Sequence, residues 1–280
     1  MRLAALLIVL LALAGCSPVG LLNTFVPQGE LERHAGIPYG AAPRQRLDVY
    51  LPRRAAASPP PPVIVFFYGG SWRGGSRDSY LFVAEALTSQ GFVVVVPDYR
   101  VYPEVRYPGF VEDGAAAVAW TRREIARHGG DPSRIFLMGH SAGAHIAAML
   151  AYDEEFLARE GLSRRDVAGL IGLAGPYDFL PLTDPKLQAV FSSEPALDRT
   201  QPIRYVRGGE PASLLVTGEG DTTVNPANTT RLAARLREVG SVVEERRFES
   251  LNHYTLLARL ASPLRSDELV ETVARFVRGH

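Results

Sequence analysis

A serine framed by glycines is the first pattern in this 280-residue sequence that could do chemistry: GHSAG at residues 139–143. The apolar run IFLM precedes it and AHIAAMLA follows it, so a strand is predicted before the serine and a helix after it. In a G-x-S-x-G turn the small residues let the chain fold back sharply and lift the hydroxyl above the sheet. The positive end of the helix dipole then favours negative charge at that point. These features predict that Ser141 is a nucleophile.

A pair of glycines lies upstream, in YGGSW at residues 68–72, directly after the apolar run VIVFF. A nucleophile on a strand-to-helix turn needs backbone N–H donors at this place, which act together with the N–H of the residue after the serine. We therefore predict an oxyanion hole formed by Gly69, Gly70 and Ala142. An ordinary glycine turn is the alternative.

The general base should be one of six histidines. Only His253 follows the last predicted strand, where the order serine, acid, histidine places the base. We predict that it takes the serine proton and returns it to the leaving group. The remaining histidines lie in the N-terminal arm, before the elbow strand, in or just after the elbow, and at the chain end: His34, His128, His140, His145 and His280.

The acid that orients the base is predicted to be Asp221, in GEGDTTV after the run SLLVT. Its role would be to fix the imidazole tautomer and to stabilise the imidazolium. Glu219 is the near alternative, and Asp178 is a weaker one that could line the pocket or cap a helix. Asp98 and Asp113 are predicted to be structural, with Asp113 at the start of a helix.

These groups need a frame of strands and helices that holds them together. Continuous apolar runs suit strands covered on both faces, and their alternation with helices implies right-handed crossovers in a doubly wound sheet. We predict an α/β fold with a mostly parallel, eight-stranded twisted sheet and helices on both faces. The expected strands are 47–51, 63–68, 92–96, 135–138, 169–173, 214–217 and 242–248, and the expected helices are 79–90, 110–128, 142–151, 226–239 and 266–278.

The first residues resemble an export signal. Met1-Arg2 precedes an apolar run at 3–13, which is shorter than the roughly 20 residues of a membrane-spanning helix. Leu13-Ala14-Gly15-Cys16 resembles the bacterial lipobox, in which the cysteine is lipidated. The resemblance implies a signal peptide at 1–15, a membrane anchor at Cys16 and a place in the cell envelope, at the outer membrane facing the periplasm. A plain signal peptide with a coincidental cysteine is the alternative.

The rest of the chain is expected to form a tether or N-terminal arm over 16–36 and a catalytic domain over 37–280. Residues 177–209 show no clear element and are predicted to be an insertion that covers the substrate. The 30 basic and 30 acidic residues balance, which gives no electrostatic reason to expect a nucleic-acid partner. Cys16 is the only cysteine, so no disulfide forms within the chain.

Several segments together resemble one family. The elbow GHSAGAHIAAML, the loop YGGSW, the segment PDYRVYPE, a helix ending in AVAW and the histidine loop NHYTL are similar to bacterial carboxylesterases related to kynurenine formamidase and to hormone-sensitive-lipase-like esterases. The resemblance spans about residues 47–276 and implies an α/β-hydrolase fold that hydrolyses small carboxylic esters through an acyl-serine intermediate, without cofactor or metal. Tyr68 stands where the related loop has a histidine, and its hydroxyl is expected to brace the loop.

Two other functions remain open at this stage. An arylformamidase or another acyl-amide hydrolase would use the same triad, and a catalytically silent member of the fold would bind or scaffold in the envelope. Trp72, Tyr99 and Phe179 are candidates for the substrate pocket, with the plain core as the alternative for each because aromatic residues dominate both places.

Overall fold

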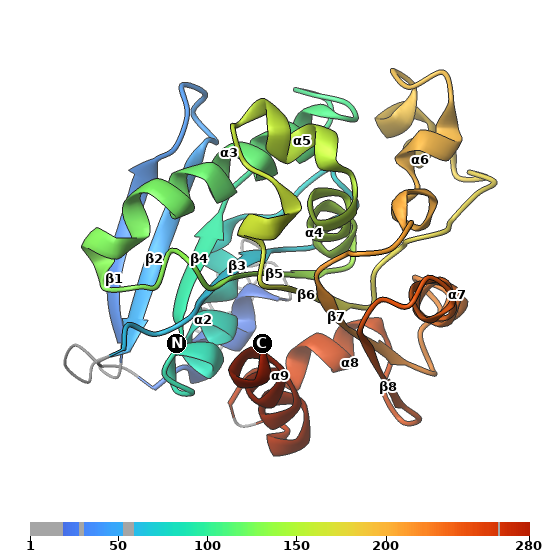
Figure 1. Ribbon diagram of the computed structural model, residues 1–280. Helices are drawn as coiled ribbons and strands as arrows, with labels where there is room; N and C mark the ends of the chain where they lie inside the picture. The colour runs from blue at the N-terminus through green and yellow to red at the C-terminus, as the bar shows by residue number, and fades with distance from the viewer. Residues whose placement is uncertain (1–18, 28–30, 53–58, 263) are drawn as a thin grey trace, which may run out of the picture.

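Eight strands form one twisted sheet in the order β1-β2-β4-β3-β5-β6-β7-β8 (Figure 1). The computed structural model describes residues 19–27, 31–52, 59–262 and 264–280. Only β2 pairs antiparallel with its neighbours β1 and β4, and all other pairs are parallel, which confirms the predicted mostly parallel sheet. The strands are β1 (Leu31–Pro38), β2 (Arg46–Pro52), β3 (Val63–Phe67), β4 (Val93–Pro97), β5 (Ile135–His140), β6 (Gly169–Leu173), β7 (Ala212–Gly218) and β8 (Val243–Phe248).

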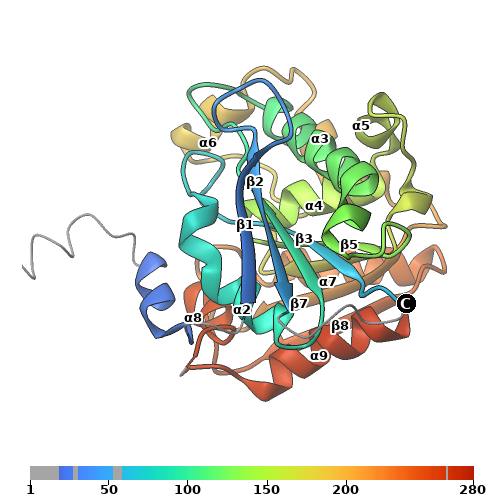
Figure 2. The same cartoon turned by 90° about the vertical axis from the view of Figure 1, so that its left-hand side faces the viewer.

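Helices cover both faces of the sheet, as predicted. Figures 1 and 2 show α3 and α4 on one face and α2 and α9 on the other. Short 3-10 helices extend α2 and α3: η2 (Arg77–Tyr80) and η3 (Ile125–His128). The α-helices are α2 (Leu81–Thr88), α3 (Gly109–Glu124), α4 (Ala142–Tyr152), α5 (Glu154–Arg159), α6 (Pro185–Phe191), α7 (Ala227–Glu238), α8 (His253–Ala258) and α9 (Asp267–Gly279).

The burial of the central strands on both faces explains why they could be predicted from the sequence. Every residue of β3 and β4 is buried, as a strand packed between two helical layers must be. In α9 the buried side chains recur on one side of the helix and include Leu269, Val273 and Phe276, the spacing of an amphipathic helix that covers a sheet.

The predicted arm at 16–36 is wrong from residue 31 onward, because β1 begins there and pairs with β2. Its side chains are mostly exposed or half-buried, and its pairing shifts between His34 and Ile37, next to Gly36 at φ 69°. An edge strand with a bulge has no regular apolar alternation, so the sequence pattern did not reveal it. The signal-peptide and Cys16 predictions lie outside the described residues.

The predicted insertion at 177–209 lies between β6 and β7 and contains short helices, so the expectation that it lacks clear elements is wrong. It consists of α6 followed by η5 (Leu197–Thr200) and η6 (Pro202–Tyr205). These elements lie at one end of the sheet, beyond α4 (Figure 1). Among the residues that the structure describes, no helix is long and apolar enough to cross a membrane.

Candidate active site

Ser141 occupies a strained turn between β5 and α4. Its backbone has φ 56° and ψ −124°, a conformation that residues other than glycine rarely adopt. A Cβ on Gly139 would lie 2.2 Å from the carbonyl oxygen of Gly143, and a Cβ on Gly143 would lie 2.0 Å from the carbonyl oxygen of Phe67. The elbow can therefore form only with glycine at both positions, as the motif predicts.

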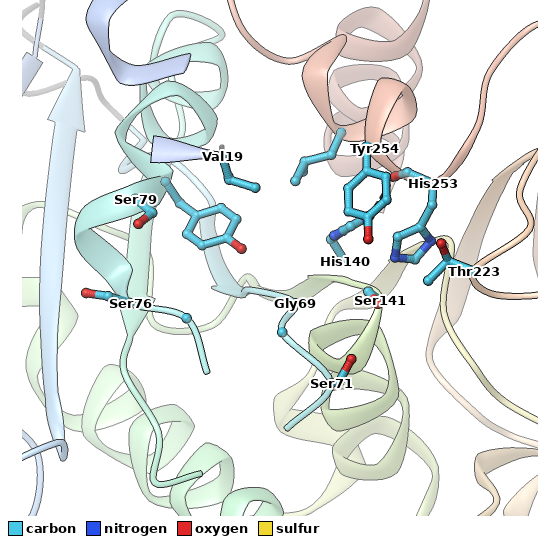
Figure 3. A pocket seen from close by; sticks show the side chains of 14 residues that line it. Val19, Gly69, Ser71, Ser76, Ser79, His140, Ser141, Thr223, His253 and Tyr254 are labelled. Carbon is cyan, nitrogen blue, oxygen red and sulfur yellow. Dashed lines mark hydrogen bonds between the residues drawn. The ribbon is translucent and has the colours of Figure 1, made fainter. Parts of the chain in front are cut away.

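His253 and Asp221 meet beside this serine. His253 is the first residue of α8, and its Nδ1 donates a hydrogen bond of 2.8 Å to Asp221 Oδ2. The other carboxylate oxygen accepts the N–H groups of Thr223 and Val224, each at 2.8 Å. Both side chains are buried, and Figure 3 shows His253 and Ser141 on the same cavity wall.

The environment keeps Asp221 charged. Burial raises the pKa of its carboxyl, but the hydrogen bonds from His253 and from the backbone N–H groups outweigh burial and lower the pKa below its ordinary value. A charged Asp221 requires a proton on Nδ1 of His253, which leaves Nε2 of the neutral ring free to accept a proton.

The alternative acids are engaged elsewhere. Glu219 forms an ion pair with Arg247 at 3.0 Å, and Asp178 forms one with Arg231 at 2.5 Å. Asp178 lines a cavity next to Ser141, in agreement with its predicted secondary role.

Asp98 and Asp113 are structural. Asp98 pairs with Arg77, and Asp113 lies inside α3, where it accepts from Arg100 and Gln45 at 2.7 Å each. The placement of Asp113 at a helix start is therefore wrong, because its carboxylate stabilises a buried cross-link and not the helix N-terminus.

The glycine loop after β3 packs directly against Ser141. A Cβ on Gly69 would lie 3.0 Å from Cβ of Ser141. The next three residues all have positive φ: 137° at Gly70, 53° at Ser71 and 56° at Trp72. Ala142 begins α4, so its N–H is one of the four that a helix leaves without an intrahelical partner. The structure thus brings the three predicted oxyanion-hole residues together around Ser141.

Tyr68 braces this loop from below. Its ring stacks between Tyr80 and Tyr99, with centroids 5.2 and 4.7 Å away. Its hydroxyl donates to Asp98 Oδ1 at 2.7 Å and accepts from Arg44 Nη2 at 3.0 Å. Burial raises the pKa of Tyr68 well above its ordinary value, so the phenol stays protonated. The predicted bracing role of the hydroxyl agrees with these contacts.

Two cavities meet at Ser141. One of 460 Å³ lies on the side of His253, and one of 520 Å³ lies under the insertion and is lined by Trp72 and Phe179. The third predicted pocket residue is wrong: Tyr99 is fully buried and donates its hydroxyl proton to the carbonyl oxygen of Tyr68 at 2.7 Å. Its side chain packs beneath the loop because its hydroxyl has a backbone partner there.

The sequence reasoning missed the role of His140. Its Nε2–H donates to the carbonyl oxygen of His253 at 3.0 Å, and the two rings lie 4.6 Å apart. Burial lowers the pKa of His140 to about 3, so the ring stays neutral. The only sequence signal for this role is that His140 directly precedes Ser141 in the chain.

His145 is buried and ties α4 to the insertion. Its Nε2–H donates to the carbonyl oxygen of Thr200 at 2.8 Å, and its ring meets Trp72 edge-on at 5.1 Å. Burial lowers the pKa of His145 to about 4. Within the described part of the chain, no group of three or more His, Cys, Asp or Glu side chains is arranged to hold a metal ion.

The sheet order, the serine elbow after β5 and the histidine after β8 define an α/β-hydrolase fold. Esterase B from Lactobacillus rhamnosis superimposes with a TM-score of 0.80 at 20% identity, over 99% of this chain and 96% of that one. The thermophilic carboxylesterase EstE1 superimposes with a TM-score of 0.77 at 23% identity, over 93% of each chain.

The chain belongs to the BD-FAE family, whose family model matches residues 47–236. Among its relatives is the esterase LipC of Mycobacterium tuberculosis, 32% identical over 72% of this chain and 54% of that protein. The probable isoprenylcysteine alpha-carbonyl methylesterase ICMEL1 of Arabidopsis thaliana is 29% identical over 87% of this chain and 55% of that protein. The chain thus spans little more than half the length of these two relatives.

Proposed function

We propose that the protein is a serine carboxylic-ester hydrolase that acts on small acyl esters through an acyl-serine intermediate. The observation that carries the proposal is the hydrogen bond between buried Asp221 and His253 on the wall of the cavity that contains Ser141. The esterase names of the relatives support it. They do not favour the alternative drawn from the sequence, an arylformamidase.

The first half of the reaction forms the acyl-enzyme. His253 Nε2 takes the proton of Ser141 Oγ as this oxygen attacks the acyl carbon. The N–H of Ala142 and those of the loop at Gly69 and Gly70 stabilise the oxyanion. When the carbon–oxygen bond of the ester breaks, the alcohol leaves with the proton held by His253.

Water completes the reaction on the same groups. His253 takes a proton from water as the water oxygen attacks the acyl-serine carbonyl, and it returns the proton to Ser141 Oγ as the acid is released. Asp221 stabilises the imidazolium in both halves, since its carboxylate stays charged and faces Nδ1.

The test uses p-nitrophenyl acetate, butyrate and octanoate beside N-formyl-kynurenine. We expect ester turnover in the wild type and a fall in kcat on the order of 10⁶-fold in Ser141→Ala. Ser133→Ala, which changes an exposed serine just before β5, at the opposite end of that strand from the elbow, is the control and should retain full activity. Ester hydrolysis that persists in Ser141→Ala, or faster cleavage of the formyl amide, would contradict the proposal.

We also propose that Cys16 carries a lipid that anchors the protein in the cell envelope. The lipobox-like sequence at 13–16 supports this proposal. In a bacterial host, the wild type should incorporate labelled palmitate and sediment with membranes, and Cys16→Ser should do neither while Ser17→Ala does both. An unlabelled wild type would leave a plain signal peptide as the correct interpretation.

A further inference from the structure

The two cavities at Ser141 have different walls. The cavity on the His253 side is lined mainly by glycine and hydroxyl-bearing residues, among them Gly75, Ser76 and Tyr80. The cavity under the insertion has large aromatic and aliphatic side chains, among them Trp72 and Leu187, and charged ones at Asp178 and Arg231. An ester bound with its carbonyl carbon at Ser141 therefore meets two environments, one for each side of the scissile bond.

The proton path assigns the sides. The leaving alcohol must receive its proton from His253, so its oxygen must lie next to that ring. His253 lines only the 460 Å³ cavity of the two that contain Ser141. The alcohol part of the substrate therefore belongs in that cavity, and the acyl chain belongs in the cavity under the insertion, beside Trp72 and Leu187.

The N-terminal segment closes the alcohol side. Val19 lines the cavity, and Figure 3 shows it across the cavity from His253. The 3-10 helix η1 (Gly20–Phe25) follows and is fastened to the catalytic body by Asn23. The Asn23 side-chain amide donates to the carbonyl oxygen of Asp78 at 2.7 Å and accepts the N–H of Phe82 at 3.1 Å.

The match to the family model begins at residue 47. Val19, which lines the cavity, therefore belongs to a segment that this match does not include. Val19 is half-buried against the hydrophobic core, so its side chain has a defined position at the rim. Val19 and Tyr80 both line this cavity, so a change in the size of the Val19 side chain changes the room that a bound alcohol group has.

We propose that Val19 limits the alcohol part of the substrate, so that the protein prefers esters that join an apolar acyl chain to a compact alcohol. This assignment rests on the proposed ester hydrolysis and adds to it which cavity takes which half. Val19 is thus a specificity residue that the chain supplies from its own N-terminal segment, with η1 holding it in place.

The experiment separates the two halves of the ester. Methyl butyrate and benzyl butyrate vary the alcohol, and methyl acetate and methyl octanoate vary the acyl chain, with acid release followed in a pH-stat. We expect Val19→Gly to raise the benzyl-to-methyl ratio of kcat/KM and Val19→Phe to lower it, each by roughly 10-fold, since a few methylenes in a pocket discriminate on that scale. The acyl ratio should stay unchanged in both variants.

Leu187→Phe is the matched control, because it enlarges one aliphatic side chain in the other cavity. It should lower the octanoate-to-acetate ratio and leave the alcohol ratio unchanged. Asn23→Ala, which releases the segment without touching the cavity, should raise the benzyl ratio as Val19→Gly does. The assignment is overturned if the Val19 variants change the acyl ratio, or if they keep wild-type ratios on both series. If the wild type hydrolyses none of the four esters, the proposed function itself fails.

Discussion

Tyr99 shows how a side chain away from the reacting atoms can control the oxyanion loop. Its hydroxyl holds the carbonyl oxygen of Tyr68, one residue before Gly69. In Tyr99→Phe that buried oxygen loses its partner, and a hydrogen bond of this kind contributes about 0.5–1.5 kcal/mol. We expect kcat on p-nitrophenyl butyrate to fall by about 3- to 10-fold, with little change in KM, because the loop's donors act mainly on the transition state.

Tyr39→Phe is the control for this prediction. Tyr39 is also buried and donates its hydroxyl proton to a backbone carbonyl oxygen, that of Asp98. Its loss should lower the free energy of unfolding to a similar degree and leave kcat unchanged. If Tyr99→Phe and Tyr39→Phe lose kcat equally, the hydroxyl of Tyr99 affects activity only by stabilising the fold, and not by holding the loop at Gly69.

The meeting of Ser141, Asp221 and His253 at one cavity could be predicted because chain order fixes where each of them lies. Ser141, Asp221 and His253 come after β5, β7 and β8, and the residues that follow parallel strands converge at one edge of the sheet. The contacts of Tyr99 and His140 join residues 31 and 113 positions apart, and nothing in the local sequence encodes such pairings. The sequence therefore predicts Tyr99 in the pocket, which is wrong, and predicts no role for His140.

Gly143 shows how tightly the elements around the elbow pack. A Cβ at this position would meet the backbone of Phe67 at 2.0 and 2.4 Å, so Gly143→Ala must push α4 away from β3. Overpacking of this kind typically destabilises by about 1–3 kcal/mol, and it moves Ser141 away from the loop. We expect urea unfolding to report a loss in that range and kcat to fall by at least about 10-fold.

Gly279→Ala provides the comparison, since nothing lies within 4 Å of a Cβ on this glycine in α9. Alanine is favoured over glycine in a helix by up to about 1 kcal/mol, so this variant should be as stable as the wild type or slightly more. A Gly143→Ala variant with wild-type stability and activity would mean that the elbow has more room than the structure shows.

The elements that could be predicted from the sequence are those whose residues are buried in a regular pattern. The central strands are buried on both faces and the long helices on one, and both cases leave a periodic pattern. The sequence failed at β1 and in the insertion, where edge exposure and short 3-10 turns give no period. The insertion is held by contacts to residues far away in the chain, such as the hydrogen bond between His145 and Thr200 and the packing of Phe191 against Trp72.

At the scale of the whole molecule, two buried histidines lie before and after Ser141 in the chain, His140 and His145. Burial lowers the pKa of His140 to about 3 and that of His145 to about 4. Both values lie below the roughly 6.5 of a histidine in an unfolded chain. Between these values the unfolded state binds protons that the native state does not. The stability that these two residues confer is complete above about pH 6.5 and is lost as the pH falls below it.

Between pH 6 and pH 5 the unfolded state should bind nearly two more protons at this pair than the native state does. The free energy of unfolding, measured by urea titration, should therefore fall in that range. Each proton corresponds to about 1.4 kcal/mol per pH unit. His145→Gln removes one of the two sites, so its slope should be smaller by about one proton, whatever its stability at pH 7. His280→Gln, at the exposed end of the chain, should keep the wild-type slope. The same slope in His145→Gln as in the wild type would mean that His145 titrates normally in the native protein, and that the packing of α4 against the insertion does not exclude its charged form.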